Sequence, residues 1–151
     1  MAITSAICNS FKQEIFQSKH DFTNGTGNTF KIALIKAQSA QAGTYGASTT
    51  NYTDVTGNSD ELANGSGYTT GGNTLTSITP TLDGSTAVCD FANTSWSSAT
   101  FTTRGCIIYN TNDSNSAVMV LDFGADYSVS NGTFTIEFPT ADASNAIIRI
   151  S

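Results

Sequence analysis

The sequence predicts a mainly β protein: an antiparallel β-sandwich or jelly roll of seven to eight short strands with one short N-terminal α-helix. Three observations predict this fold class. Short apolar segments alternate with turn signals through the second half of the chain. A helical apolar period occurs once, near the N-terminus, so the chain has no βαβ rhythm. Charged residues make up only 12% of the 151 residues, and the abundance of Thr, Ser and Asn suits pleated strands and turns.

Residues 1–20 are expected to form an N-terminal amphipathic helix or arm. An apolar residue recurs at every fourth position, at Ile3, Ile7, Phe11 and Ile15. This spacing predicts a helix over residues 3–16, capped by Thr4 or Ser5. The apolar stripe either lies in a groove of another protein or covers the chain's own sheet, and the sequence favours the two equally. Its four residues are therefore candidate partner contacts.

Residues 21–151 are expected to form the sandwich domain, with a long irregular segment at 37–73. The turn sequence TNGTGN ends the helical pattern and leads into a first strand, TFKIALIKA, whose apolar residues alternate. Few side chains of the irregular segment can serve as packing anchors: Tyr45, Tyr52, Val55, Leu62 and Tyr68. A connection of this length is usually functional, partnered or mobile.

After residue 73 the expected strands are TLTSITPTL, TAVCDF, ATFTTRGCIIYN, AVMVLDF, YSVS, TFTIEF and AIIRI. Two dipeptides, Asp83-Gly84 and Asn131-Gly132, favour tight hairpin turns because both tolerate positive φ. TNDSNS is interpreted as a hairpin tip, ANTSWSS as irregular, and GAD at 124–126 as a short connection. Few charged residues protect the edges of these strands, so we expect partner chains to cover some of them.

The glycine-rich stretch NGSGYTTGGNTL, residues 64–75, raises the question of a phosphate-binding loop. A P-loop requires GxxxxGK[ST], but Asn73 and Thr74 occupy the positions of its lysine and its hydroxyl residue. The glycines also miss the final spacing of a dinucleotide-binding fingerprint, and a strand-like segment follows them. We expect them to serve tight turns or a close approach to another chain, with Tyr68 as a packing anchor and a candidate partner contact.

The other reactive residues indicate no catalytic, cofactor or metal site. His20, the only histidine, is expected at the surface or at a helix terminus, because no local signature supplies a nucleophile for it. Spacing singles out no pair among the carboxylates available for glycoside hydrolysis, which are Asp90, Asp122, Asp126 and Glu137. A calcium loop at 110–121 would need Gly and Glu where Asn115 and Leu121 stand.

Charge and cysteine usage exclude further classes. The net charge is −6 and the six basic residues are scattered along the chain, so nucleic acid is not an expected partner. Cys8, Cys89 and Cys106 are an odd number without CxxC spacing, which favours reduced thiols in the core over a disulfide frame or a zinc site. We also expect neither a secretion signal nor a membrane span, and synthesis in a cytosol.

Trp96, the only tryptophan, has two interpretations. A large aromatic side chain commonly seals the end of a sandwich, and this is the favoured one. The alternative is a platform on which a sugar ring stacks. The chain would then be a carbohydrate-binding module that uses exposed aromatic residues, among them Trp96, Tyr45, Tyr52 or Tyr68.

Three segments of the chain carry a resemblance to a known class of proteins: ICNSFKQEIFQSKHDFTNGTGNTFKIAL, GSGYTTGGNTL, and FANTSWSSATFTTRGCIIYN followed by AVMVLDFG. Together they resemble small virion proteins of tailed bacteriophages. The resemblance implies a non-enzymatic capsid decoration, or cement, protein that binds the major capsid protein and stabilises its lattice. It further implies homotrimers on the capsid surface, made in the host cytoplasm, with no catalytic residue. The alternatives are a carbohydrate- or receptor-binding module of a head fibre or tail, or a head–tail component.

Overall fold

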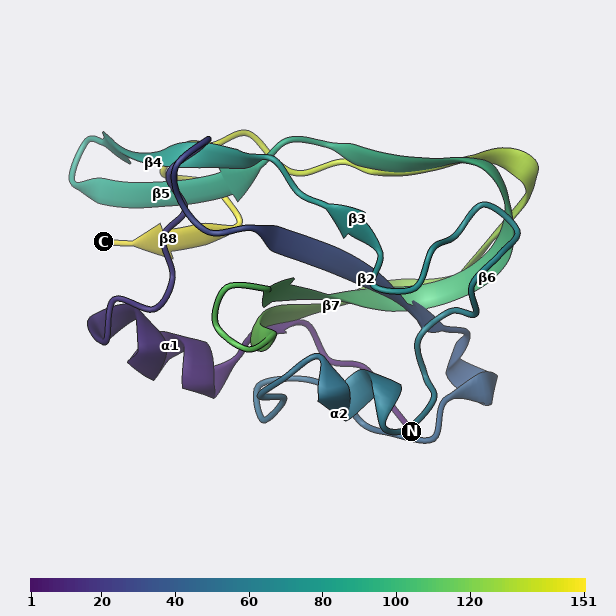
Figure 1. Ribbon diagram of the computed structural model, residues 1–151. Coiled ribbons are helices and arrows are strands. Elements are labelled where there is room, and N and C mark those ends of the chain that lie inside the picture. Colours follow the sequence, from purple (N-terminus) through teal and green to yellow (C-terminus); the bar gives the residue numbers. More distant parts are fainter.

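A computed structural model describes all residues 1–151 and shows two antiparallel β-sheets with little helix, so the predicted fold class is confirmed (Figure 1). The strands are β1 (Ala6–Ile7), β2 (Phe30–Lys36), β3 (Asn73–Thr74), β4 (Ser77–Asp83), β5 (Thr86–Phe91), β6 (Thr94–Asn110), β7 (Ser116–Ile136) and β8 (Ile148–Ile150). The helical elements are α1 (Asn9–Phe16), α2 (Thr53–Thr56) and a 3-10 turn, η1 (Gln38–Ala40). One sheet has the order β1-β7-β6-β2-β3 and the other the order β4-β5-β8.

The long hairpin of β6 and β7 joins the two layers. These strands have 17 and 21 residues, far more than the short strands that the sequence predicts. In Figure 1 their ribbon runs beside β2 in the lower layer, turns upward at the right and returns along the top toward β4 and β5. Three of the four breaks in the pairing register of β6 and β7 lie between Trp96 and Gly105, and they allow this bend.

Two of the predicted turns are bulges inside β7. Thr103 pairs with Tyr127 and Gly105 with Asp122, so the segment GAD bulges out of the strand without ending it. A second bulge contains Asn131, whose φ is 45°, where the sequence predicts a hairpin turn. The prediction was wrong because a residue that tolerates positive φ serves a bulge as well as a tight turn. ANTSWSS was also misjudged, since β6 already begins at Thr94.

The other predicted turns are confirmed. Asp83 and Thr86 close the hairpin of β4 and β5 around Gly84, whose φ is 60°. TNDSNS forms the tip between β6 and β7, from residue 111 onward.

The N-terminal helix is shorter than predicted. It begins at Asn9, and its N-cap is Cys8, which makes no side-chain capping bond, so neither Thr4 nor Ser5 caps it. Residues before it are extended: β1 pairs with the edge of β7, and Ile3 forms a bridge with Tyr45. Residues 6–7 pair with the free edge of β7 and therefore do not form the helix that the four-residue apolar period predicts. The period alone cannot reveal such a partner strand.

Twenty-seven buried residues form one core between and beneath the layers. Phe22 and Phe30 stack with ring centroids 4.2 Å apart, and Phe91 packs against both. The three cysteines are free and buried, as predicted. Gly72 explains part of the glycine-rich stretch, because a Cβ there would clash with the Ile32 carbonyl oxygen. That stretch turns and packs closely against the chain's own strand β2.

Candidate functional site

An apolar groove lies between α1 and the small sheet. Phe11 and Ile15 are one helical turn apart and share a face of α1, while Ile148 and Ile150 share a face of β8. These four side chains line two adjoining hollows of about 340 and 150 Å³. Pro80, Ala87 and Cys89 of the sheet extend the floor. Figure 1 shows α1 directly beneath β8 at this end of the molecule.

Three large apolar side chains stand exposed around this groove. Phe16 is 92% exposed, Leu82 73% and Ile150 58%. Phe16 and Ile150 line the larger hollow, and Leu82 lies in one cross-strand row with Ala87 and Ile150. Together they leave roughly 400 Å² of apolar surface in water, within the range of the largest apolar patches on soluble monomers, which are often functional.

The charged residues that line the groove are both basic, Lys12 and Arg149. Arg149 alternates with Ile148 and Ile150 along β8, and its guanidinium donates to the carbonyls of Ala143 and Ser144. Lys12 is exposed, with a single hydrogen bond of 3.2 Å to the side chain of Asn9. Lys12 is therefore the cation that a bound partner can reach.

A second hollow, of about 300 Å³, opens beside the bent ribbon. Its lining is largely aromatic and aliphatic, and its one charged residue is acidic: Phe123, Tyr127, Phe134, Thr135, Ile136 and Glu137. Beyond Val120 no strand pairs with the outer edge of β7, since β1 reaches only Met119 and Val120. The inward-facing side chains Phe123 and Phe134 therefore stay partly exposed.

The structure divides the five predicted contact residues into two groups. Ile3, Phe11 and Tyr68 are buried in the chain's own core. Ile7 and Ile15 keep part of their side chains at the surface and line the groove. Half of the apolar stripe thus covers the chain's own sheet, and the other half remains available to a partner.

A buried carboxylate that the sequence did not reveal organises the irregular segment. Glu61 accepts hydrogen bonds from the hydroxyls of Tyr52 and Tyr68 and, at 2.6 Å, from the Gly71 amide. Tyr68 in turn accepts the Leu34 amide of β2 at 3.0 Å. Burial, reinforced by the charge of Glu61, raises the pKa of Tyr68. Glu61 and Tyr68 therefore tie residues 61–71 to the central strand.

Its neighbour Asp60 holds the other end of the segment. Its carboxylate accepts the amides of Ala42 and Gly43 and the hydroxyl of Tyr45. Burial alone would raise the pKa of Asp60, but these three donors and the charge of Lys36 outweigh it and lower that pKa. Two adjacent acidic residues in a tyrosine-containing segment are the only sequence signal for this arrangement.

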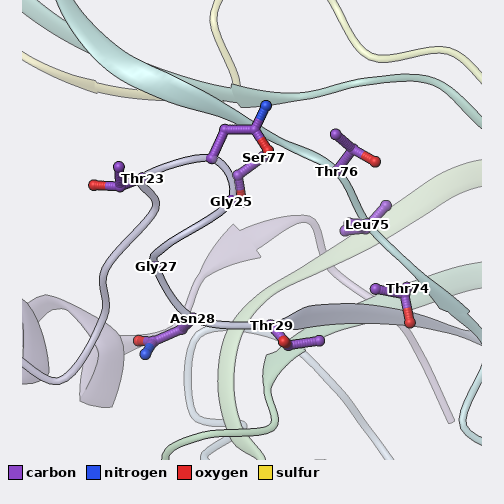
Figure 2. A pocket seen from close by; sticks show the side chains of 10 residues that line it. Thr23, Gly25, Gly27, Asn28, Thr29, Thr74, Leu75, Thr76 and Ser77 are labelled. Carbon is purple, nitrogen blue, oxygen red and sulfur yellow. The ribbon is translucent and has the colours of Figure 1, made fainter.

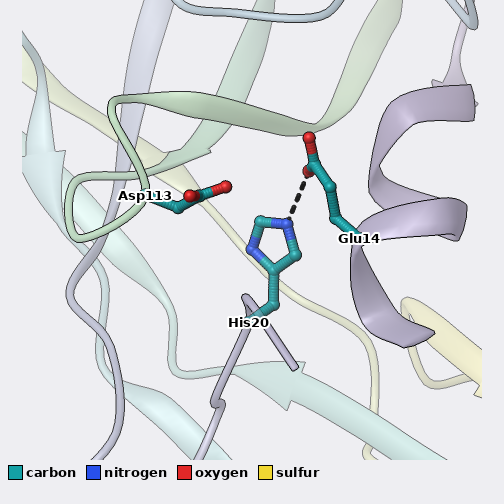
Figure 3. Close-up of side chains that lie close together, drawn as sticks. All are labelled: Glu14, His20 and Asp113. Carbon is teal, nitrogen blue, oxygen red and sulfur yellow. Dashed lines mark hydrogen bonds and ion pairs between the residues drawn. The ribbon is translucent and has the colours of Figure 1, made fainter. Parts of the chain in front are cut away.

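Glu14, His20 and Asp113 come together between α1 and the tip of β6 and β7 (Figure 3). Their nearest ligand atoms lie within 4.8 Å of one another. The His20 side chain is fully buried, which corrects the surface position expected from the sequence. His20 can be buried because Phe11 packs against its imidazole ring and both ring nitrogens have hydrogen-bond partners.

Hydrogen bonds fix the tautomer of His20. Asn110 uses its side-chain oxygen to accept the Asn112 amide, so its nitrogen faces Nδ1 of His20 at 3.0 Å. Nδ1 must then accept, and Nε2 carries the proton that it donates to Glu14 at 2.8 Å. A metal ion would need the lone pair of Nε2, which is not free in this arrangement. We interpret the cluster as a structural network.

A polar hollow of about 190 Å³ separates the 23–29 turn from residues 74–77 (Figure 2). Hydroxyl, amide and backbone groups line it, and Leu75 is its one hydrophobic residue. A sugar site usually adds an aromatic platform, and none lines this hollow. Trp96 is buried, as the favoured interpretation predicts, and so are Tyr45 and Tyr68. Tyr52 stacks on Tyr109, with ring centroids 4.3 Å apart.

Most of the candidate hydrolytic carboxylates are occupied within the chain. Asp90 is fully buried and accepts the amides of Phe91 and Ile147. Asp122 forms an ion pair with Arg104 at 2.7 Å, and Asp126 accepts the Gln38 amide. These bonds give the three side chains structural roles.

Comparison of the chain with protein-family models, with curated proteins and with solved structures found no match. No helix of the protein has the length and apolar character needed to cross a membrane.

Proposed function

We propose that this protein is a non-enzymatic structural subunit of a tailed-bacteriophage virion, in which it decorates the capsid and cements the lattice of the major capsid protein. The observation that supports the proposal best is the clustering of exposed apolar side chains around one groove. Phe16, Leu82 and Ile150 are three of the six large hydrophobic side chains exposed on the whole surface. The resemblance of three sequence segments to phage virion proteins supports a virion as the assembly to which the protein belongs.

The area of this surface suits assembly. Protein interfaces are roughly 57% apolar, and standard ones cover about 800 Å² on each partner. The roughly 400 Å² of exposed apolar surface around the groove supplies most of the apolar half of one such interface. Patches of this size are often functional, and in an assembled shell neighbouring subunits would cover this one.

The proposed mechanism is mechanical rather than chemical. A decoration protein adds contact area across the joints between capsomers, and each contact is of modest strength. Repetition over a closed shell multiplies these contacts, because a subunit held at one side rebinds at the other with a high effective concentration. The internal bonds of Asp60 and Glu61 keep the subunit rigid, so little conformational entropy is lost when it binds.

Copy number in purified particles tests this function. We expect hundreds of copies per virion and, in particles assembled with Phe16→Asp, a lower occupancy. Gln13→Asp is the matched control, because Gln13 is exposed on the same helix and lines neither hollow of the groove. A dozen or fewer copies of the wild type per virion would remove the decoration role, and absence from the particle would remove the virion role.

A further inference from the structure

We propose that the groove between α1 and β8 receives the Tyr127 end of a second copy of this chain. This inference rests on the proposed function, since it names the surfaces through which copies of that subunit join. Both surfaces belong to one chain, and they complement each other in apolar character and in charge.

The groove has room for an aromatic ring. An apolar cavity of roughly 150 Å³ already holds a benzene molecule, and the larger hollow of the groove measures about 340 Å³. Its lining comes from the packed helix α1 and the paired strand β8, both fixed to the core through Phe11 and Ile148. A preformed apolar hollow of this kind favours a rigid side chain that loses little rotamer freedom.

Tyr127 is the side chain of the ribbon that fits this description. It is 51% exposed, and it is the one exposed large hydrophobic residue of β6 and β7. Its ring packs edge-on against Phe123, with centroids 6.3 Å apart, and this contact restricts the conformations of the tyrosine. Tyrosine is among the residues that contribute most to protein interfaces.

The charges of the two surfaces favour a second copy of this chain as the partner that occupies the groove. Lys12 is the charged side chain of the groove that a partner can reach, since the Arg149 guanidinium is bound to the Ala143 and Ser144 carbonyls, and no acidic residue lines the groove. The hollow beside Tyr127 is lined by Glu137 and by no basic residue. The chain has twelve acidic and six basic residues, so a basic groove is unusual on its surface. Docking one surface on the other brings opposite charges together, whereas docking either surface on itself opposes like charges.

The two surfaces share no residue: α1 and β8 form most of the groove, and β7 with Glu137 lines the hollow beside Tyr127. In Figure 1, α1 and β8 are at the left, and the bent end of the β6–β7 ribbon is at the right. A chain therefore does not fill its own groove, and the contact joins different patches of two copies. Such a heterologous contact produces a closed ring when the rotation between neighbours closes.

A mixing experiment tests the contact. The wild type is expected to form oligomers in sedimentation velocity, and Phe16→Asp and Tyr127→Asp, each alone, are expected to be monomeric. Each variant should weaken association at least about 30-fold, as expected for loss of a hot spot. Mixed in equal amounts, the two variants should form dimers and nothing larger, because one intact groove meets one intact tyrosine. Gln13→Asp should assemble like the wild type.

Several results would overturn the inference: a monomeric wild type, a Tyr127→Asp variant that still assembles, or a mixture that stays monomeric. Lys12→Glu and Glu137→Lys provide a second test, since each should weaken assembly and the two variants mixed together should restore it. Thermal unfolding of every variant shows that the fold is intact. Particle copy number is measured separately, so a monomeric wild type that still coats the virion would overturn the groove contact and leave the proposed function standing.

Discussion

Removal of the Glu61 carboxylate is expected to destabilise the protein strongly. In Glu61→Ala the buried Tyr68 hydroxyl and the Gly71 amide lose their acceptor, and the half-buried Tyr52 hydroxyl turns to water. A buried donor left without a partner costs about 1–3 kcal/mol, so the two buried donors together cost about 2–6 kcal/mol. Release of the desolvated charge offsets part of this loss. We expect a net loss of about 4 kcal/mol in the free energy of unfolding.

The conservative variant separates charge from shape. In Glu61→Gln the amide oxygen can still accept from Tyr68 and Gly71, while the Tyr52 hydroxyl rotates to accept from the amide nitrogen. Charge-assisted hydrogen bonds are about twice as strong as neutral ones, so this variant should lose only about 1 kcal/mol.

Urea unfolding followed by tryptophan fluorescence measures these losses. Trp96 is the only tryptophan and is buried, so its emission reports unfolding of the core. Gln13→Ala is the control, because Gln13 is exposed, lines neither hollow of the groove and should change stability by less than about 0.5 kcal/mol. The expected loss in Glu61→Ala corresponds to a melting temperature roughly 8–16 °C lower. Equal stabilities of Glu61→Ala and Gln13→Ala would refute the structural role of this carboxylate.

Three further predictions follow from buried or strained positions. The folded protein lowers the pKa of Asp60 from 3.8, so the stability that Asp60 contributes is present above pH 3.8 and is lost as the pH falls through the lower pKa of the folded state. Asp60→Asn should therefore flatten the acid side of a curve of stability against pH. An unchanged acid side would argue against this role. Gly72→Ala should cost more than about 3 kcal/mol in urea unfolding, because its Cβ would clash with the Ile32 carbonyl oxygen of β2, whereas Gly25→Ala, with free space around it, should cost about 1 kcal/mol. Burial raises the pKa of Cys8 and of Cys89 to about 12, so a thiol reagent should label neither in the native protein; labelling before unfolding would contradict their burial.

The sequence predicted the class of fold because period-2 alternation and turn chemistry are local signals. It misjudged the length of β7 because Gly124 and Asn131 carry the same positive-φ signal in a bulge as in a turn. It extended the N-terminal helix too far because the edge of β7, which pairs with Ala6 and Ile7, lies more than 100 residues away along the chain. The local preference of residues 6–7 for helix or strand gives no information about a partner so distant in the sequence.

The candidate site was partly predictable. The apolar stripe identified Ile7 and Ile15, which line the groove, but the sequence did not indicate that β8 forms its other wall. Nothing in a short AIIRI segment shows which strand it pairs with or which helix it faces. Glu61 was missed for a related reason, since its partners Tyr52 and Tyr68 become recognisable only when the segment folds back on β2.

The claim that this chain is a subunit of an assembled shell is tested most directly by an electron cryo-microscopy map of the particle. The account predicts density for this fold at regular positions on the outside of the capsid, with protein side chains packed against Phe16 and Ile150. A map in which the fold is present but the groove between α1 and β8 faces solvent would contradict the assembly role assigned to that surface.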